Sequence, residues 1–182
     1  MTKGHHPALP YPKLPEFIAT LRTQEAGSAR ALEFTILTAA RSGEVTGATW
    51  SEFDTQAKLW TVPKERMKRG QEHTVPLSGA AVDIIDAMAL GSDREPGAYV
   101  FPGLKANKPT SHATMRKLIR NLGYTSITTH GFRATFKTWA GDATNYPRDL
   151  AELALSHAVG NEVEEVDVRE GSIRIPELRS QA

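Results

Sequence analysis

Apolar residues recur at spacings of three and four along most of this chain, which predicts helices, because such positions share one helix face. Phe17, Ile18 and Leu21 mark a first short helix over residues 14–23, with a proline in its first turn. Serine precedes several later segments, where its side chain can cap backbone N–H groups. Further helices are expected over 28–40, 78–88 and 111–122, with Ser28, Ser78 and Ser111 as their respective N-caps. Three more are expected from about 130, over 145–155 and from about 160.

Two short segments between these helices, residues 59–62 and 73–77, are rich in β-branched and aromatic residues and predict strands. Residues 50–53 are a candidate third strand. The loop between the two strands, residues 64–72, carries four cations and completes a hairpin. No internal repeat is found in the sequence. The pattern predicts a mostly α fold with one small antiparallel sheet, which is an α+β architecture.

The composition is that of one globular domain, with 182 residues of which 40% are hydrophobic and 24% charged. The absence of cysteine excludes disulfides and thiolate chemistry. Neither a membrane-length apolar run nor a signal-peptide pattern occurs, so we expect a cytoplasmic protein without a membrane partner. Three prolines in residues 1–13 predict a linker. The adjacent side chains of His5 and His6 point in different directions, which argues against a metal site.

The net charge of +1 conceals an uneven distribution. Residues 105–148 hold eight Lys and Arg against one acid, whereas residues 149–182 hold eight Asp and Glu against three arginines. A basic middle segment favours a polyanionic partner, and nucleic acid is the first candidate. A solvated basic surface would have the same composition, so charge alone does not decide between them.

The stretch 128–136 places an imidazole beside a guanidinium. His130 and Arg133 are three residues apart and share one face of the expected helix, which Lys137 extends. The neighbouring aromatic stripe at i, i+4 and i+7 comprises Phe132, Phe136 and Trp139. This stripe predicts the buried side, so His130 and Arg133 are expected to point outward. Arginine grips two phosphate oxygens and histidine can move a proton, which suits an anionic group in transfer, although a solvated helix face carries the same pair.

A second arginine, Arg41, follows the apolar helix that ends near residue 40 and stands three residues before Glu44. The Glu44 carboxylate can hold the guanidinium at a fixed angle. The alternative is a cation that complements the C-terminal end of the helix dipole. The hairpin loop leaves a similar choice, since its cations either reach a phosphate or are solvated.

Five polar residues now stand in order: Arg41 in Ala-Ala-Arg-Ser-Gly-Glu, Lys68 in the hairpin, His130 and Arg133 in His-Gly-Phe-Arg, and His157 in Leu-Ser-His. This order resembles the catalytic domain of the tyrosine recombinases, in particular the phage integrases of the P4 type. The resemblance covers roughly residues 5–166 and extends to the segments between these five residues, such as Glu-Arg-Met-Lys and His-Thr-Val-Pro-Leu-Ser. It implies the fold of enzymes that break and rejoin DNA.

The resemblance also implies a role for each residue in handling a scissile phosphate. Arg41 and Arg133 match the two arginines that clamp it, and fixed cations there stabilise the transition state without a metal or cofactor. The other matches are His130 for a phosphate contact and proton transfer, His157 for a second contact, Lys68 for protonation of the leaving 5′ oxygen, and Glu44 for support of the first arginine. Double-stranded DNA is then the partner, and the cations assigned to its binding are Arg116, Lys117, Arg120 and Lys137. Self-association on DNA is implied for a full-length relative.

The nucleophile position departs from the family pattern. The family has a tyrosine ten residues after the second histidine, and that position holds Asp167 in this chain. The chain's four tyrosines are Tyr11, Tyr99, Tyr124 and Tyr146, the last of which is expected to pack. Beyond Arg169 the family pattern is lost. We therefore expect a catalytic domain over 14–170 and a divergent tail over 171–182, as in a truncated or frameshifted gene, without the upstream DNA-binding modules of a full integrase.

Two functions remain open at this point. One is the catalytic domain of a site-specific recombinase, which binds DNA and positions a phosphate for cleavage and rejoining but has lost its nucleophile. The other is an inactive DNA-binding remnant or regulatory protein of the same fold. A helical protein–protein module with incidental cations is a third reading, but it leaves the order of the five residues to coincidence.

Overall fold

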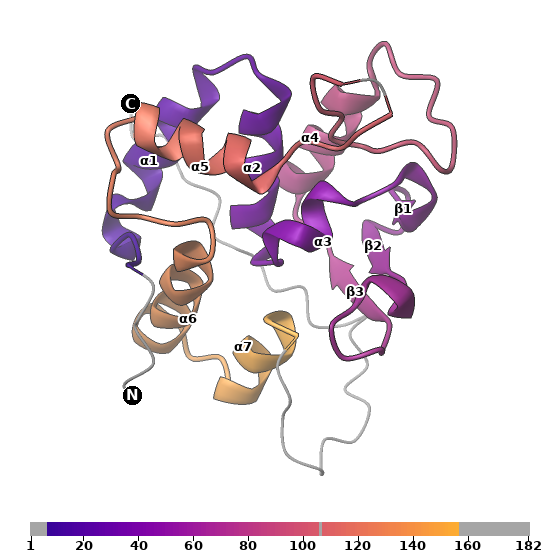
Figure 1. The fold of residues 1–182 in the computed structure, drawn as a ribbon. Helices are drawn as coiled ribbons and strands as arrows, with labels where there is room; N and C mark the ends of the chain where they lie inside the picture. The colour runs from indigo at the N-terminus through magenta and orange to yellow at the C-terminus, as the bar shows by residue number, and fades with distance from the viewer. Residues whose placement is uncertain (1–6, 106, 157–182) are drawn as a thin grey trace.

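The structure, a computed structural model, describes residues 7–105 and 107–156. Within them it contains seven α-helices, three short 3₁₀ helices and one three-stranded sheet (Figure 1). The mostly α fold with a small antiparallel sheet is therefore confirmed. The α-helices are α1 (Leu14–Arg22), α2 (Gly27–Thr38), α3 (Ser42–Thr46), α4 (Gly79–Ala89), α5 (His112–Asn121), α6 (Gly131–Ala143) and α7 (Arg148–Ala154).

The sheet forms one side of the molecule, away from α1 (Figure 1). Its strands, antiparallel and in the order β1-β2-β3, are β1 (Phe53–Asp54), β2 (Leu59–Val62) and β3 (His73–Pro76). The predicted hairpin of β2 and β3 is present, with Val62 opposite His73 and Trp60 opposite Val75. The candidate third strand is shorter than expected, because Trp50–Glu52 forms a 3₁₀ turn.

The helix α2 lies at the centre of the core. Its Phe34 packs against Trp60 of β2, with ring centroids 5.3 Å apart, and against Phe101 at 5.5 Å. All three side chains are fully buried. Aromatic side chains bury more apolar surface than others, so these contacts join the sheet to the helical layer.

Both ends of α2 differ from the sequence prediction. The helix begins at Gly27 with Ala26 as its N-cap, so Ser28 lies inside the first turn and is not the cap. It ends at Thr38, because Ala39 adopts a left-handed conformation with φ of 51° and turns the chain. This turn directs the chain into α3, where the first of the two arginines lies.

The N-caps predicted for α4 and α5 are confirmed. The Ser78 hydroxyl accepts a hydrogen bond from the Ala81 N–H at 3.3 Å, and the Ser111 hydroxyl accepts one from the Thr114 N–H at 3.1 Å. Each bond satisfies a backbone donor that has no partner within the helix.

The segment before α1 packs against α6. Leu9 is buried, and its carbonyl accepts a hydrogen bond of 2.6 Å from the Thr135 hydroxyl. A Cβ atom at Gly131 would collide with the Pro7 carbonyl, so this approach of the two backbones requires glycine. Leu9 therefore anchors this segment to the domain, while most of residues 7–13 are exposed, and the expected linker over residues 1–13 stays a prediction.

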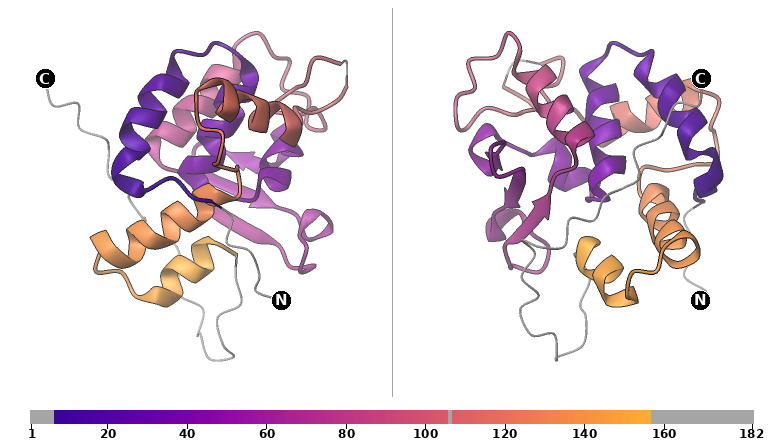
Figure 2. Two further views of the ribbon diagram at one scale, coloured as in Figure 1. Left: turned by 60° about the vertical axis from the view of Figure 1, so that its left-hand side comes forward. Right: turned by 180° about the vertical axis from the view of Figure 1, so that it is seen from behind.

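Helices α6 and α7 lie side by side at one end of the molecule (Figures 1 and 2). The short 3₁₀ turn Tyr11–Lys13 also lies against α6. Among residues 7–105 and 107–156, every helix is too short or too polar to span a bilayer.

Candidate active site

Arg41 is held by Glu44 at the start of α3. The Arg41 backbone N–H donates to one oxygen of the carboxylate and its Nη1 donates to the other, both at 2.8 Å. Glu44 is buried, whereas 27% of the Arg41 side chain is exposed. The ion pair expected from the spacing is present. It fixes the guanidinium and leaves further N–H donors for other partners.

Arg133 is buried, with 5% of its surface exposed, so the prediction that it points outward is wrong. Its guanidinium donates to the carbonyl oxygens of Ala39, at the turn after α2, and of Leu155, after α7. The ends of helices leave carbonyl groups without partners, and these groups carry partial negative charge. A guanidinium has five donors and can therefore be buried where several such carbonyls meet.

The two arginines meet at the end of α7. Arg41 Nη2 donates to the Ser156 carbonyl at 3.4 Å, next in sequence to the Leu155 carbonyl that Arg133 contacts. Burial, and after it the charge of Arg41, lowers the pKa of Arg133 to about 10. Arg133 is still protonated at neutral pH. The site therefore brings two positive charges together at backbone carbonyls, with the Glu44 carboxylate beside Arg41.

His130 is exposed at the N-cap of α6, one turn before Arg133. The helix thus carries an exposed imidazole at its positive end and a buried guanidinium one turn later. The two side chains do not share one outward face as expected. His157 and Asp167 lie outside the described residues, and their roles stay predictions.

The aromatic stripe of α6 is buried only in part, which corrects the prediction for this face. Phe132 is buried against Phe17, with ring centroids 5.0 Å apart. Phe136 and Trp139 are half-buried and line an apolar groove of about 670 Å³ between α6, α1 and the start of α4. Arg133 lies on the side of α6 that contacts the end of α7, where its guanidinium is buried.

The hairpin loop between β2 and β3 holds its cations in two ways. Arg66 forms an ion pair with Glu52 and a hydrogen bond to the Glu44 carbonyl. Met67 is buried, with 6% of its surface exposed, whereas the next residue, Lys68, is exposed. Lys68 therefore extends into solvent from a loop whose base is attached to α3.

His73 lies at the site, although the motifs in the sequence do not single it out. It is the first residue of β3 and is half-buried. Burial lowers the pKa of its imidazole below 6.5; of the nearby charges, Glu44 raises this pKa and Arg41 and Arg133 lower it. The ring is thus within electrostatic reach of both arginines. His73 is two residues before the buried Val75 on β3, so both side chains lie on the same face of the strand. This spacing is the signal in the sequence that indicates an inward side chain.

A family model described as the phage integrase family matches residues 9–165. The chain belongs to this family. It is 35% identical over 158 residues to prophage integrase IntZ of Escherichia coli (strain K12), and 33% identical over 178 residues to the integrase of Enterobacteria phage P4. The matches cover 85% and 87% of this integrase-family chain and 38% and 40% of the two relatives. The chain therefore spans about two fifths of the length of these curated relatives.

Solved structures share the fold of this integrase-family chain. The Tn1549 transposon integrase in complex with transposon right end DNA matches with a TM-score of 0.67 at 15% identity, over 87% of this chain and 60% of that one. XerA recombinase matches with a TM-score of 0.65 at 18% identity, over 87% and 59%. At these identities the likeness is one of fold, and it confirms the tyrosine recombinase catalytic fold.

The outer face of α5 carries part of the basic surface that the charge excess in residues 105–148 predicts to bind DNA. Its exposed residues include Arg116, Lys117 and Arg120, and its buried ones are Met115 and Ile119. The start of α5 lies beside the arginine site, because His112 Nδ1 is 2.9 Å from the hydroxyl of Ser42, the residue after Arg41. The basic face of α5 therefore begins next to the site.

Lys137 differs from the cations of α5. Its Nζ forms an ion pair of 2.5 Å with Glu152, which joins α6 to α7. DNA would have to compete with this carboxylate, so a DNA contact by Lys137 stays a prediction. In the loop before α7, Tyr146 is 44% exposed, and the packing expected for it is wrong.

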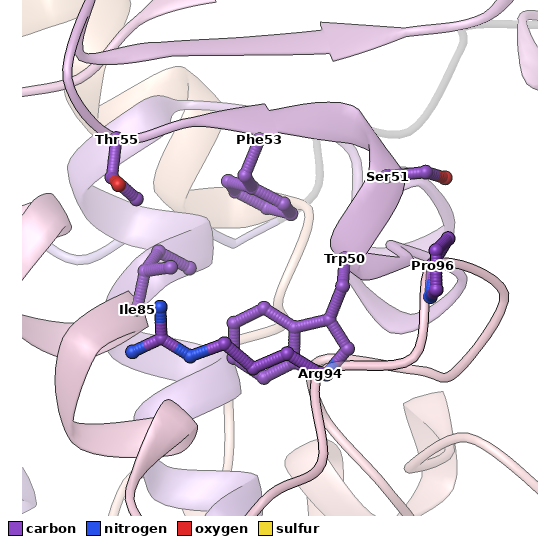
Figure 3. Close-up of a pocket in the computed structure, with 7 residues that line it drawn as sticks. All are labelled: Trp50, Ser51, Phe53, Thr55, Ile85, Arg94 and Pro96. Atoms are coloured by element: carbon purple, nitrogen blue, oxygen red, sulfur yellow. The ribbon is translucent and has the colours of Figure 1, made fainter.

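A smaller pocket, of about 230 Å³, lies beside the sheet and shares no lining residue with the arginine site (Figure 3). The Arg94 guanidinium lies over the Trp50 ring, with Cζ 5.8 Å from the ring centroid. This contact packs the loop after α4 on the 3₁₀ turn Trp50–Glu52 that precedes the sheet. In the part of the chain that the structure describes, no three His, Asp or Glu side chains gather as a metal site.

Proposed function

We propose that this integrase-family domain binds double-stranded DNA and holds one backbone phosphate at Arg41 and Arg133, as the catalytic domain of a site-specific recombinase. The observation that carries the proposal is the meeting of the two guanidinium groups at the consecutive carbonyls of Leu155 and Ser156. A phosphate oxygen carries more negative charge than a carbonyl oxygen. A phosphate therefore competes for the N–H donors of the two arginines. To bind there, it has to displace the carbonyls at the end of α7.

Fixed guanidinium groups suit phosphoryl transfer, because negative charge spreads over the non-bridging oxygens in the transition state. Glu44 orients Arg41 before substrate arrives, and helix-end carbonyls orient Arg133. Donors that are already in place need no rearrangement as the charge develops, so they lower the barrier. The lowered pKa of Arg133 reflects the cost of burying it there.

Three further roles in the proposal come from the family resemblance. His130 contacts the phosphate and assists proton transfer, His157 makes a second contact, and Lys68 protonates the leaving 5′ oxygen. The exposure of Lys68 beside the anchored Arg66 supports its role, since a flexible stem on a fixed base can follow the reacting oxygen.

We infer that the chain as written forms no covalent DNA intermediate, because Asp167 stands at the position of the family's tyrosine. A tyrosine phosphodiester persists until rejoining. An aspartate is already anionic at neutral pH and is repelled by the phosphate, and an acyl phosphate would hydrolyse and leave a nick. The alternative function is an inactive DNA-binding remnant or regulatory protein that keeps the same site.

The relatives support a DNA partner. Among structures of similar fold, the Tn1549 transposon integrase is in complex with transposon right end DNA, and XerH recombinase is bound to its difH substrate. On this chain, the exposed cations of α5 begin beside the arginine site, where they can follow a DNA backbone. A cytoplasmic location and self-association on DNA belong to the same proposal.

A salt titration with a short duplex, followed by fluorescence anisotropy, tests DNA binding. Affinity should fall by orders of magnitude between about 50 and 200 mM salt, because phosphate contacts release counterions. The variant Arg116→Gln/Arg120→Gln should bind more weakly, with a salt slope reduced by about one per lost contact. The control Lys13→Gln/Lys58→Gln removes two exposed cations from other elements. Binding that ignores salt, or no binding at low salt, would contradict the proposal.

A duplex nicked near the scissile phosphate tests the chemistry. The wild-type chain should form no denaturation-resistant adduct, since loss of an essential nucleophile costs roughly a million-fold in rate. An adduct mapped by mass spectrometry to any residue would contradict the inference on Asp167. Asp167→Tyr combined with a family-like C-terminal helix should form the adduct, and the same chain with Arg41→Gln is its control. Failure of the restored chain would favour the inactive remnant.

A further inference from the structure

His73 lies where the sheet meets the arginine site. It pairs with Val62, the last residue of β2. The chain then enters the hairpin loop, in which Arg66 donates to the Glu44 carbonyl in α3. Glu44 in turn holds Arg41. The Arg66 hydrogen bond thus attaches the hairpin loop to α3, strand register joins the start of β3 to the same hairpin, and Figure 1 shows the hairpin beside that helix.

The side chain of His73 faces inward. Along β3, Val75 is buried, whereas Thr74 and Pro76 are exposed. His73 has the same parity as Val75, because side chains alternate between the two faces of a strand. The imidazole is half-buried rather than fully buried, since the strand ends there.

Among the described residues, the charged groups that act on the pKa of His73 come from two helices. They are Arg41 and Glu44 of α3 and Arg133 of α6. Burial and the two arginines together outweigh Glu44, so the ring is neutral at neutral pH. A neutral imidazole keeps one N–H donor and adds no third positive charge to the site in the absence of DNA.

We propose that His73 is a further phosphate-contacting residue, whose imidazole N–H donates a hydrogen bond to the DNA phosphate held by Arg41 and Arg133. The inference rests on the proposed function, because it requires a phosphate at the two arginines. It adds a donor from the sheet to those from α3 and α6. The phosphate would then be contacted from three elements that meet only in the folded domain.

Phosphate binding should be coupled to protonation of His73. The negative charge of a phosphate favours the imidazolium, so it raises the pKa of His73 above the lowered value in the free domain. Affinity therefore rises as pH falls through the pKa of the bound state, and it levels off below the pKa of the free state. A difference of one unit between the two pKa values changes affinity about tenfold.

The test is duplex affinity from about pH 8 to about pH 5.5, the range in which histidine titrates. The ratio of wild-type to His73→Asn affinity should rise by about threefold to tenfold as pH falls. His73→Gln should behave like His73→Asn. The matched control is Thr74→Asn on the opposite face of β3, which should keep the wild-type profile. Any effect of His130 titration on affinity cancels in this ratio, because His130 is present in both proteins.

A ratio of one at every pH would overturn the role of His73 and leave DNA binding intact. If the wild-type domain binds no duplex at all, the proposed function fails together with this inference. An NMR titration of the assigned His73 ring in the wild-type domain needs no variant, so it also covers the case in which a substitution prevents folding. The pKa of the ring should rise when the duplex is added, and an unchanged pKa would overturn the inference.

Discussion

The arginine site and the hairpin loop both carry several cations, but they hold them in opposite ways. At the site, Arg133 is buried among backbone carbonyls and Arg41 is bound by a buried carboxylate. In the loop, Arg66 is attached to Glu52, while Lys68 two residues later extends into solvent. One region fixes its charges before a substrate arrives, and the other leaves a charge at the end of a flexible stem.

This difference separates two tasks in phosphoryl transfer. Charge on the non-bridging oxygens develops at one place, so the donors that stabilise it benefit from being fixed. A proton has to reach one leaving oxygen at one stage, so its donor benefits from a stem that can move. The predictions below test this contrast between fixed and extended cations.

Arg133→Leu should have the largest effect. It removes the donor from the carbonyls of Ala39 and Leu155, so the free energy of unfolding should fall by about 2–5 kcal/mol. Urea unfolding followed by tryptophan fluorescence measures this change. The control Lys137→Met, on the same helix, removes a half-exposed ion pair and should cost less than about 1 kcal/mol. Equal losses of unfolding free energy in the two variants would show that the bonds of Arg133 to these carbonyls do not hold it in place.

Arg41→Gln should lower duplex affinity as well as stability, since it also leaves the buried Glu44 carboxylate without its Nη1 partner. Hydrogen bonds to charged groups contribute about 1.5–3 kcal/mol, so duplex affinity at low salt should fall roughly tenfold to a hundredfold. Anisotropy measures the loss on folded protein. The matched control is Arg30→Gln, which breaks another pair of the same spacing, with Glu33 at 3.0 Å. If both variants lose the same affinity, overall charge rather than the site explains binding.

The hairpin should respond differently at Arg66 and Lys68. Arg66→Ala leaves Glu52 and the Glu44 carbonyl without this donor and should cost about 1–3 kcal/mol in unfolding free energy. Lys68→Ala should change stability by less than about 0.5 kcal/mol, because its side chain is exposed. Thermal unfolding of both variants measures which substitution costs more stability. A larger loss for Lys68→Ala than for Arg66→Ala would contradict a loop that is anchored by Arg66 and leaves Lys68 in solvent.

His73 should give the smallest effect on stability. Its pKa is lowered below 6.5 in the folded domain, so between these two values the unfolded chain binds more protons than the folded one. Stability should therefore fall as pH falls from 6.5 to the lowered pKa, and the contribution is constant below it. Urea unfolding across this range should show a shallow decline for wild type that His73→Asn lacks. Parallel profiles would show that the pKa of the ring is not lowered in the folded domain.

Local features of the fold were accessible to sequence patterns. Ser78 and Ser111 cap their helices as predicted, because the bond runs to a residue three positions away. The Arg41–Glu44 pair also spans three residues. The end of α2 was not accessible, since the left-handed turn at Ala39 goes together with a bond from Arg133 that spans 94 residues.

The sequence by itself determined the fold class, the hairpin and the order of residues that resembles the integrase family, because these depend on local spacing and on residue identity. Tertiary structure alone decided that Arg133 is buried and that His73 lies near the two arginines. A helical period tells which residues share a face, but it does not tell what covers that face. In this domain the cover is α7, whose terminal carbonyl at Leu155 stabilises a charge that the pattern predicts to be solvated.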